Sequence, residues 1–305
     1  METKVNLKAV LAIIATTLFW GLSYTSTKVL LGSLLPVQIA FFRLLLACLA
    51  LGIFFFASKK RLVHKSDLLR VIAGGVFGNF IYFLFENNGL RFTTAGTGSL
   101  IIATIPVLNV LAGAILFREK NTNKRWLGVI LSFVGVYFII RSGSNGTFSL
   151  ANIKGNLLVF GAACAWVAFT RINEPLLNRY DSITINLHQS AVGMFLLSFL
   201  IIPLETDLSV LRGSVAFNLA YLGIFCSAVA FFLYLYALKT LGTATVTSYI
   251  NLVPVFGVLG GAIILKETLV AGQLLGGAIV IAGVSLVTMS GKSAAQSTKQ
   301  VSTAE

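Results

Sequence analysis

Charged residues are rare in the long apolar stretches of this sequence, and Arg43 and Glu86 are two that could perform specific chemistry. A buried guanidinium group can bind a carboxylate, and a buried carboxylate can bind and release a proton. Arg43, Glu86 and Lys28 lie at similar depths in their stretches, so we expect Arg43 and Glu86 to pair directly or through a water molecule. The alternative is that Lys28 and Arg43 extend to the lipid headgroups.

Other polar and aromatic residues within the apolar stretches could line a cavity. Asn79, Tyr82 and Glu86 are spaced so that they share one face of a helix. The further candidates are Trp20, Tyr24, Ser99, Trp166, Thr170, Gln189, Tyr234, Tyr249 and Asn251. Each could instead form a hydrogen bond between helices, but together these residues suit an amphipathic small molecule.

The sequence offers little for catalysis or metal binding. It has two histidines, His64 in a loop and His188 in an apolar stretch, and no Asp or Glu pattern joins them. The three cysteines lie in apolar runs and are interpreted as packing residues, and there is no nucleotide-binding loop. We therefore expect no catalytic residue, metal site or cofactor, although an intramembrane enzyme, a receptor or a scaffold remain alternative classes.

The composition is that of a membrane protein. Of the 305 residues, 57% are hydrophobic and 11% are charged, and the mean hydropathy is +0.90. Soluble chains carry about a quarter charged residues. The net charge of +13 is assigned to loops that face anionic lipid headgroups, since no polar domain could form a nucleic-acid groove.

Ten apolar stretches are long enough to cross a bilayer as helices, and the loops between them are short. They cover residues 9–30, 37–57, 70–90, 97–117, 125–141, 155–172, 183–204, 215–238, 243–265 and 270–290. The first resembles a signal peptide, but no small-residue cleavage site follows, so we expect it to be retained. Residues 291–305 are rich in Ser, Thr, Ala and Gln and are predicted to be a disordered tail.

The basic residues in the loops predict the orientation. With the N-terminus in the cytoplasm, 16 of the 23 Lys and Arg residues lie on the inner side and 5 on the outer side. This bias is typical of cytoplasmic loops, so both termini are predicted to be cytoplasmic. A miscounted span would break the alternation, so the bias also favours ten spans.

Two segments 148 residues apart are nearly the same. IPVLNVLAGAILFREK follows Thr104, and VPVFGVLGGAIILKET follows Leu252. The match predicts two five-span repeats, residues 9–141 and 155–290. Because five is odd, the second repeat is predicted to cross the membrane in the opposite direction to the first.

Pro106 and Pro254 occupy the middle of the fourth and ninth stretches, where each removes one helical hydrogen bond. They predict helix breaks beside a central site, or alternatively kinks that serve packing alone. Glu119 and Glu267 follow Arg118 and Lys266 at the membrane edge, and we interpret them as anchors near the positive ends of helices. The repeated glycines, such as Gly128 and Gly135, are interpreted as packing positions.

The ordered set of motifs resembles the drug/metabolite transporter superfamily, in its ten-helix EamA form. The motifs are an apolar residue before Pro-Val, then Arg/Lys-Glu, then Gly and Gly-Val, all in duplicate. Trp20-Gly21, Trp166 and Arg43 fit as well. The repeats differ where Arg43 aligns with Gln189 and Glu86 aligns with Tyr234, so the site is expected to be asymmetric.

The resemblance implies an α-helical carrier in the cell membrane of a bacterium, which moves small metabolites through a central cavity. Relatives of this kind export amino acids and related compounds. The implied partners are a small-molecule substrate, the lipid bilayer and a coupling proton or ion, with no nucleic acid. The sequence leaves the substrate, the direction of transport and the oligomeric state open.

Overall fold

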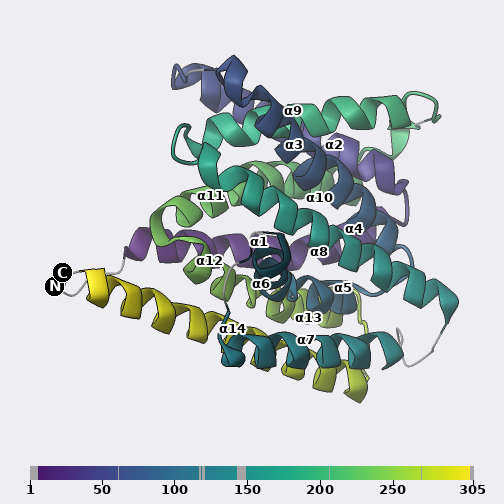
Figure 1. Ribbon diagram of the computed structural model, residues 1–305. Coiled ribbons are helices and arrows are strands. Elements are labelled where there is room, and N and C mark those ends of the chain that lie inside the picture. Colours follow the sequence, from purple (N-terminus) through teal and green to yellow (C-terminus); the bar gives the residue numbers. More distant parts are fainter. Residues whose placement is uncertain are drawn as a thin grey trace.

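The structure is a computed structural model that describes residues 6–60, 62–116, 118, 121–142, 149–205, 207–268 and 270–302. Regular structure within these ranges is entirely helical (Figure 1). The predicted all-α class is therefore confirmed. Side chains at 243, 244, 247, 248 and 288–302 lie outside the description.

The first half of the chain contains five helical segments. The first two are α1 (Leu7–Leu30) and α2 (Pro36–Ala57). The third is continuous and consists of α3 (Leu68–Gly75), the π-helical η2 (Val76–Ile81) and α4 (Tyr82–Leu90), preceded by the short η1 (Lys65–Asp67). The fourth consists of α5 (Ala95–Ile102) and α6 (Ile105–Leu116), and the fifth is α7 (Asn123–Ser142).

The second half has the same order of segments. It begins with α8 (Leu150–Leu176) and α9 (Ser182–Ile201). After the short η3 (Leu208–Val210) come α10 (Ser214–Ala220), the π-helical η4 (Tyr221–Val229) and α11 (Ala230–Leu241). The interrupted segment is α12 (Thr243–Ile250) with α13 (Val253–Ile264), and the last helix is α14 (Ala271–Ser302).

Eight helical segments in the described part of the chain are long and apolar enough to cross a membrane. They correspond to the first eight predicted stretches, which makes this a multi-pass membrane protein. The remaining apolar helices, Val253–Ile264 and Ala271–Val287, are shorter. The ninth and tenth spans therefore stay a prediction.

The fourth and ninth predicted stretches are each interrupted at their centre. α5 ends at Ile102 and α6 begins at Ile105, while α12 ends at Ile250 and α13 begins at Val253. Pro106 and Pro254 are each the second residue of the new helix, where a missing backbone N–H costs nothing. The prolines thus start the second half of each segment, and the break lies just before them.

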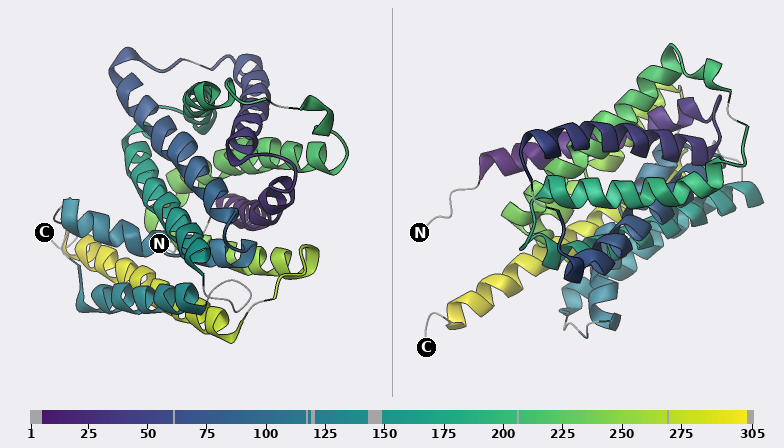
Figure 2. Two further views of the ribbon diagram at one scale, coloured as in Figure 1. Left: turned by 90° about the vertical axis from the view of Figure 1, so that its right-hand side faces the viewer. Right: turned by 90° about the horizontal axis from the view of Figure 1, so that it is seen from above.

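Glycines allow α7 and α14 to cross in direct backbone contact. A Cβ atom built on Gly135 would lie 2.6 Å from the carbonyl oxygen of Gly276, and one on Gly276 would lie 2.7 Å from that of Gly135. Gly128 and Gly283 form a second reciprocal pair of the same kind. The two helices lie side by side in every view (Figures 1 and 2). The interpretation of these glycines as packing positions is confirmed.

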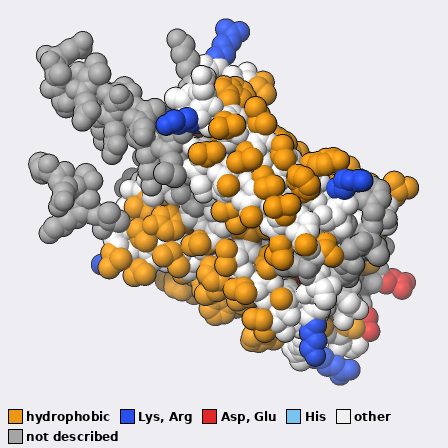
Figure 3. Space-filling view, turned by 90° about the horizontal axis from the view of Figure 1, so that it is seen from below, with side chains coloured by type: hydrophobic (Ala, Val, Ile, Leu, Met, Phe, Trp, Pro, Cys, Tyr) orange, Lys and Arg blue, Asp and Glu red, His pale blue; other side chains and the backbone are white. Residues whose placement is uncertain are grey.

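The outer face of this helix pair is apolar. Leu127, Ile130, Leu274 and Leu275 are all more than half exposed. Hydrophobic side chains spread over the described part of this face, and Lys and Arg lie mostly toward its edges (Figure 3). A surface of this composition is suited to lipid acyl chains between two headgroup layers.

The helix α14 extends beyond its predicted end at residue 290. The backbone is helical as far as Ser302, in the segment for which the composition predicted a disordered tail. The residues concerned include Ala294, Ala295 and Gln296, which have high helix propensity, and no proline interrupts them. The cytoplasmic location of this segment stays a prediction.

The glycine crossing predicts opposite effects for two Gly→Ala substitutions. Gly135→Ala should lower the free energy of unfolding by about 1–3 kcal/mol, because the new Cβ meets backbone atoms that cannot move aside. Gly52→Ala is the matched control, because a Cβ there meets nothing within 4 Å. It should be neutral or stabilising by up to about 1 kcal/mol. Thermal unfolding in detergent measures both, and equal stability of wild type and Gly135→Ala would contradict the crossing.

Candidate functional site

A narrow cavity lies at the centre of the molecule, between the two interrupted segments. Ile102 and Ile105, which flank the first break, border it, and so do Ile250 and Val253, which flank the second. The other lining residues are Trp20, Ser23, Tyr24, Arg43, Tyr82, Phe83, Glu86, Trp166 and Phe231. The volume open to the centre of a water-sized sphere is about 20 Å³, which is room for about one water molecule. Side chains therefore close the cavity in this conformation.

Six of the predicted cavity residues line this space. They are Trp20 and Tyr24 of α1, Arg43 of α2, Tyr82 and Glu86 of α4, and Trp166 of α8. Thr170 and Tyr234 lie directly behind this lining. Thr170 donates to the Trp166 carbonyl at 3.0 Å, and its hydroxyl lies 3.4 Å from that of Tyr234.

Aromatic rings form a wall that adjoins Arg43 and Glu86 through Tyr82 and Phe83. The rings of Trp20 and Trp166 meet edge to face with centroids 5.0 Å apart. The Tyr234 ring lies 5.2 Å from Trp20 and 5.5 Å from Trp166, and Phe231 contacts both indoles. Interlocked rings of this kind give a rigid apolar surface with few rotatable bonds.

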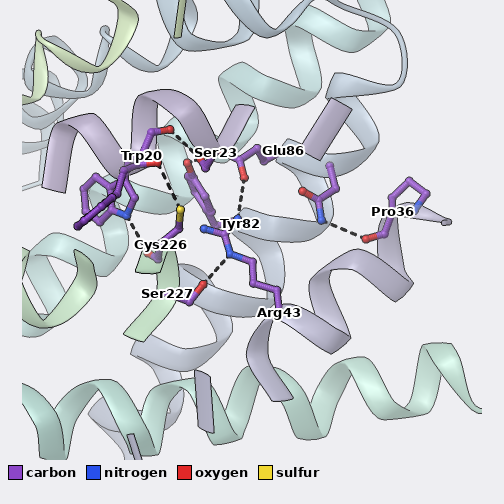
Figure 4. A network of polar contacts seen from close by, with 10 residues as sticks. Trp20, Ser23, Pro36, Arg43, Tyr82, Glu86, Cys226 and Ser227 are labelled. Atoms are coloured by element: carbon purple, nitrogen blue, oxygen red, sulfur yellow. Dashed lines mark hydrogen bonds and ion pairs between the residues drawn. The ribbon is translucent and has the colours of Figure 1, made fainter. Parts of the chain in front are cut away.

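Arg43 and Glu86 form the polar side of the cavity (Figure 4). Arg43 Nη1 lies 3.8 Å from Glu86 Oε2, so the predicted pairing is confirmed. Arg43 Nε donates to Ser227 Oγ at 2.6 Å, and the guanidinium lies 4.0 Å above the Phe83 ring. Tyr82 donates its hydroxyl to Glu86 Oε1 at 2.7 Å. Both charged side chains are almost completely buried, which is affordable only because each has several partners.

Lys28 does not join this pair. Its Nζ donates to the carbonyl of Leu90 at 2.9 Å and to that of Thr93 at 3.0 Å. The Leu90 carbonyl is at the C-terminal end of α4, where a cation is favoured, and Thr93 lies in the turn that follows. Lys28 therefore ties α1 to the end of the third segment.

Glu267 anchors a helix, as interpreted, but the helix belongs to the other half of the chain. Its carboxylate accepts from the backbone N–H groups of Ala95 at 2.9 Å and Gly96 at 3.1 Å, at the start of α5. Lys266 has a left-handed backbone, with φ 54°, which turns the chain just before the carboxylate. Arg118, at the matching position, has φ 53°, while its neighbour Glu119 lies outside the described residues.

Asn79 does not share the cavity face with Tyr82 and Glu86, contrary to the helical spacing. It lies in η2, where the i→i+5 pattern adds a residue to the turn and changes the direction of its side chain. Asn79 instead packs against Gly193 of α9, and its Nδ2 atom has no hydrogen-bond partner. The π-helical turn therefore explains why Asn79 is not among the lining residues.

Four further candidates also lie outside the cavity lining. Gln189 donates to Asn173 Oδ1 at 3.0 Å, between α9 and α8. Ser99 donates to the Gly96 carbonyl at 2.8 Å and faces Gly257. Tyr249 is half-buried in α12, and Asn251 lies in the break that follows it. For Gln189 the alternative, a hydrogen bond between helices, describes the structure, whereas the bond of Ser99 lies within α5.

The sequence reasoning missed Ser227 and Phe83 as partners of Arg43. Both carried a usable signal, because they fall at matched positions of the repeat. Ser227 corresponds to Asn79, and Phe83 corresponds to Phe231. Their contact with Arg43 depends on how the second half of the chain packs against the first, which no single segment indicates.

Comparison with known proteins places the chain in a family. The model of the EamA-like transporter family matches residues 7–141 and again residues 153–289. The chain belongs to the EamA-like transporter family. This establishes the superfamily resemblance and a general role in transport.

Several related proteins align with this chain over most of its length. An uncharacterized transporter from Archaeoglobus fulgidus is 32% identical over 287 residues, which cover 93% of this chain and 98% of the relative. A probable terminal-alkyne amino-acid exporter from Streptantibioticus cattleyicolor is 27% identical, covering 92% and 93%. A probable amino-acid metabolite efflux pump from Salmonella typhimurium is 26% identical, covering 87% and 89%.

A solved crystal structure has the same fold. It aligns with a TM-score of 0.66 over 93% of this chain and 98% of the other, at 18% identity. At this identity the similarity concerns the fold alone.

The buried ion pair predicts a non-additive response to substitution. Arg43→Met should lower the free energy of unfolding by about 3–5 kcal/mol, because it leaves the Glu86 carboxylate buried without its cation. The double variant Arg43→Met/Glu86→Gln should recover part of this loss. Unfolding by denaturant in detergent measures the cycle, with Glu86→Gln as the second single variant. If the losses of unfolding free energy in the two single variants add up to the loss in the double variant, the pair is not coupled.

Proposed function

We propose that this protein is a secondary transporter that exports amino acids or related small metabolites by alternating access. The observation that carries the proposal is the closed central cavity between two interrupted helices, lined by a buried Arg43–Glu86 pair and by aromatic rings. Intramembrane charges and broken helices at one depth are typical of substrate and ion sites in carriers.

Alternating access requires two related halves, and several features recur at a separation of 148 residues. The breaks between Ile102 and Ile105 and between Ile250 and Val253 correspond in this way. So do residues of the two π-helical segments, η2 and η4. These correspondences support two five-span repeats of opposite orientation, which would let the same packing open toward either side.

The orientation proposed from the loop charges has structural support. The first turn of α1 and the described end of α14 lie on the same side of the molecule (Figure 1). A chain that begins and ends on one side crosses the membrane an even number of times. This supports an even number of crossings, as the proposed ten would give.

An amino acid or a related carboxylate fits the chemistry of the cavity. A guanidinium group is the side chain best suited to bind a carboxylate, and Arg43 is the cavity residue that provides one. The aromatic wall would contact an apolar part of the same molecule. The names of the relatives from Streptantibioticus and Salmonella support both the substrate class and the outward direction.

Counterflow into liposomes tests the function. Purified protein should exchange at least one compound from a panel of amino acids and related metabolites, with saturable kinetics that protein-free liposomes lack. Arg43→Lys keeps the charge but loses the planar donor fork, so it should reduce exchange of a carboxylate substrate by roughly tenfold. If no compound shows counterflow, a non-transport role is favoured.

We further propose Glu86 as the proton carrier, because it is the carboxylate that faces the cavity. Glu86→Gln keeps the size of the side chain and an acceptor for the Tyr82 hydroxyl, but it cannot titrate. The variant should lose the pH dependence of net transport while retaining exchange. Uptake measured across a series of external pH values gives the result, and an unchanged pH dependence in Glu86→Gln would reject this role.

A further inference from the structure

Trp20 and Trp166 hold matching positions in the two halves of the chain, yet their indole N–H groups have different environments. Both rings line the cavity and touch each other. A symmetric pair would make the same hydrogen bond twice. The hydrogen bonds of the two indole N–H groups therefore show which one is used in helix packing and which one has no hydrogen-bond partner.

The indole of Trp20 is used by the fold. Its Nε1 donates to the carbonyl oxygen of Cys226 at 3.0 Å (Figure 4). Cys226 lies in η4, and a π-helical turn leaves carbonyls without their usual helical donors. In lipid such a carbonyl needs a partner from the protein. Trp20 provides it.

The indole of Trp166 has no such partner. Gly78 corresponds to Cys226, but the Phe169 ring packs against it. Trp166 Nε1 is fully buried without a hydrogen bond, and the side chain is only 3% exposed. The Tyr234 hydroxyl lies near the indole, without a hydrogen bond of acceptable geometry.

Arg43 brings a second donor without a hydrogen bond to the same cavity. Its Nε is bonded to Ser227, but Nη1 has no hydrogen bond and lies 3.8 Å from Glu86. A buried donor without an acceptor costs about 1–3 kcal/mol, so a ligand that supplies acceptors would recover this cost. Glu86, the carboxylate of the cavity lining, already accepts from Tyr82 and faces Arg43.

We infer that the cavity recognises the anionic end of its ligand, through Arg43 Nη1 and Trp166 Nε1, and that an ammonium group is dispensable. The inference rests on the proposed function and narrows its substrate class to small organic carboxylates with an apolar body. Trp166 is a binding residue that contacts the ligand. Trp20 contributes the neighbouring part of the wall, and its N–H is bonded to η4.

Nitrogen-15 labelling of tryptophan in the full-length protein provides a direct test, because the chain has three indole N–H groups. Trp→Phe variants assign the three resonances. The probes are 3-phenylpropionate, phenylalanine and phenylethylamine, which present a carboxylate alone, both groups, and an ammonium alone. The first two should shift the Trp166 resonance in a saturable manner. Phenylethylamine should not shift it, and the Trp20 resonance should keep its hydrogen-bonded position throughout.

Binding constants of the same probes give the second measurement. Trp166→Phe should weaken binding of 3-phenylpropionate by about tenfold, the equivalent of one hydrogen bond to a charged group. Trp126→Phe is the matched control, because Trp126 lies on the exposed side of α7, and it should bind like the wild type. Calorimetry on the purified protein in detergent measures these constants without requiring transport.

The outcomes separate this inference from the proposed function. Trp166-dependent binding without counterflow would uphold the anion site and reject the transport role. Counterflow with equal binding by wild type and Trp166→Phe would uphold transport and overturn the inference. Binding of phenylethylamine as tight as that of 3-phenylpropionate, or binding of none of the three probes, would also overturn it.

Discussion

A backbone carbonyl or amide that loses its helical partner inside a bilayer has no water to bind, so the protein itself must supply a partner or a polar cavity. This chain interrupts or widens four of its segments, at two breaks and two π-helical turns. Side chains from distant segments satisfy freed groups at one π-helical turn and at two ordinary helix ends. Trp20 donates to the Cys226 carbonyl in η4, and Lys28 donates to the Leu90 carbonyl at the end of α4. The Glu267 carboxylate accepts from the Ala95 N–H at the start of α5. The irregular backbone thus determines which segments contact each other.

The same constraint explains why the polar centre is so compact. Arg43 and Glu86 are tolerated in the interior because Ser227, Phe83 and Tyr82 share their charge. Ser227 lies in the π-helical η4, and Tyr82 and Phe83 lie in α4, directly after the π-helical η2. Backbone irregularity and charge burial are therefore two aspects of one arrangement, and a substitution in either is expected to affect the other.

The sequence predicts much of this arrangement, and the misses have identifiable causes. Pro106 and Pro254 indicate both breaks because proline cannot continue a helix. The pairing of Arg43 with Glu86 follows from their similar depth. Asn79 was misplaced because a π-helical turn has no strong sequence signal, and one extra residue redirects a side chain. The partner of Glu267 was also missed, since the start of α5 lies 172 residues away in the chain.

The small volume of the cavity, about 20 Å³, has a consequence for inhibition. No amino acid fits the closed form, so any ligand must bind an open form, and its apparent affinity is reduced by the rarity of that form. A compound that fills the open cavity but is too large for the closed one would hold the protein open. Such a compound would act as an inhibitor because of its bulk, and its potency would increase with every substitution that loosens the aromatic wall.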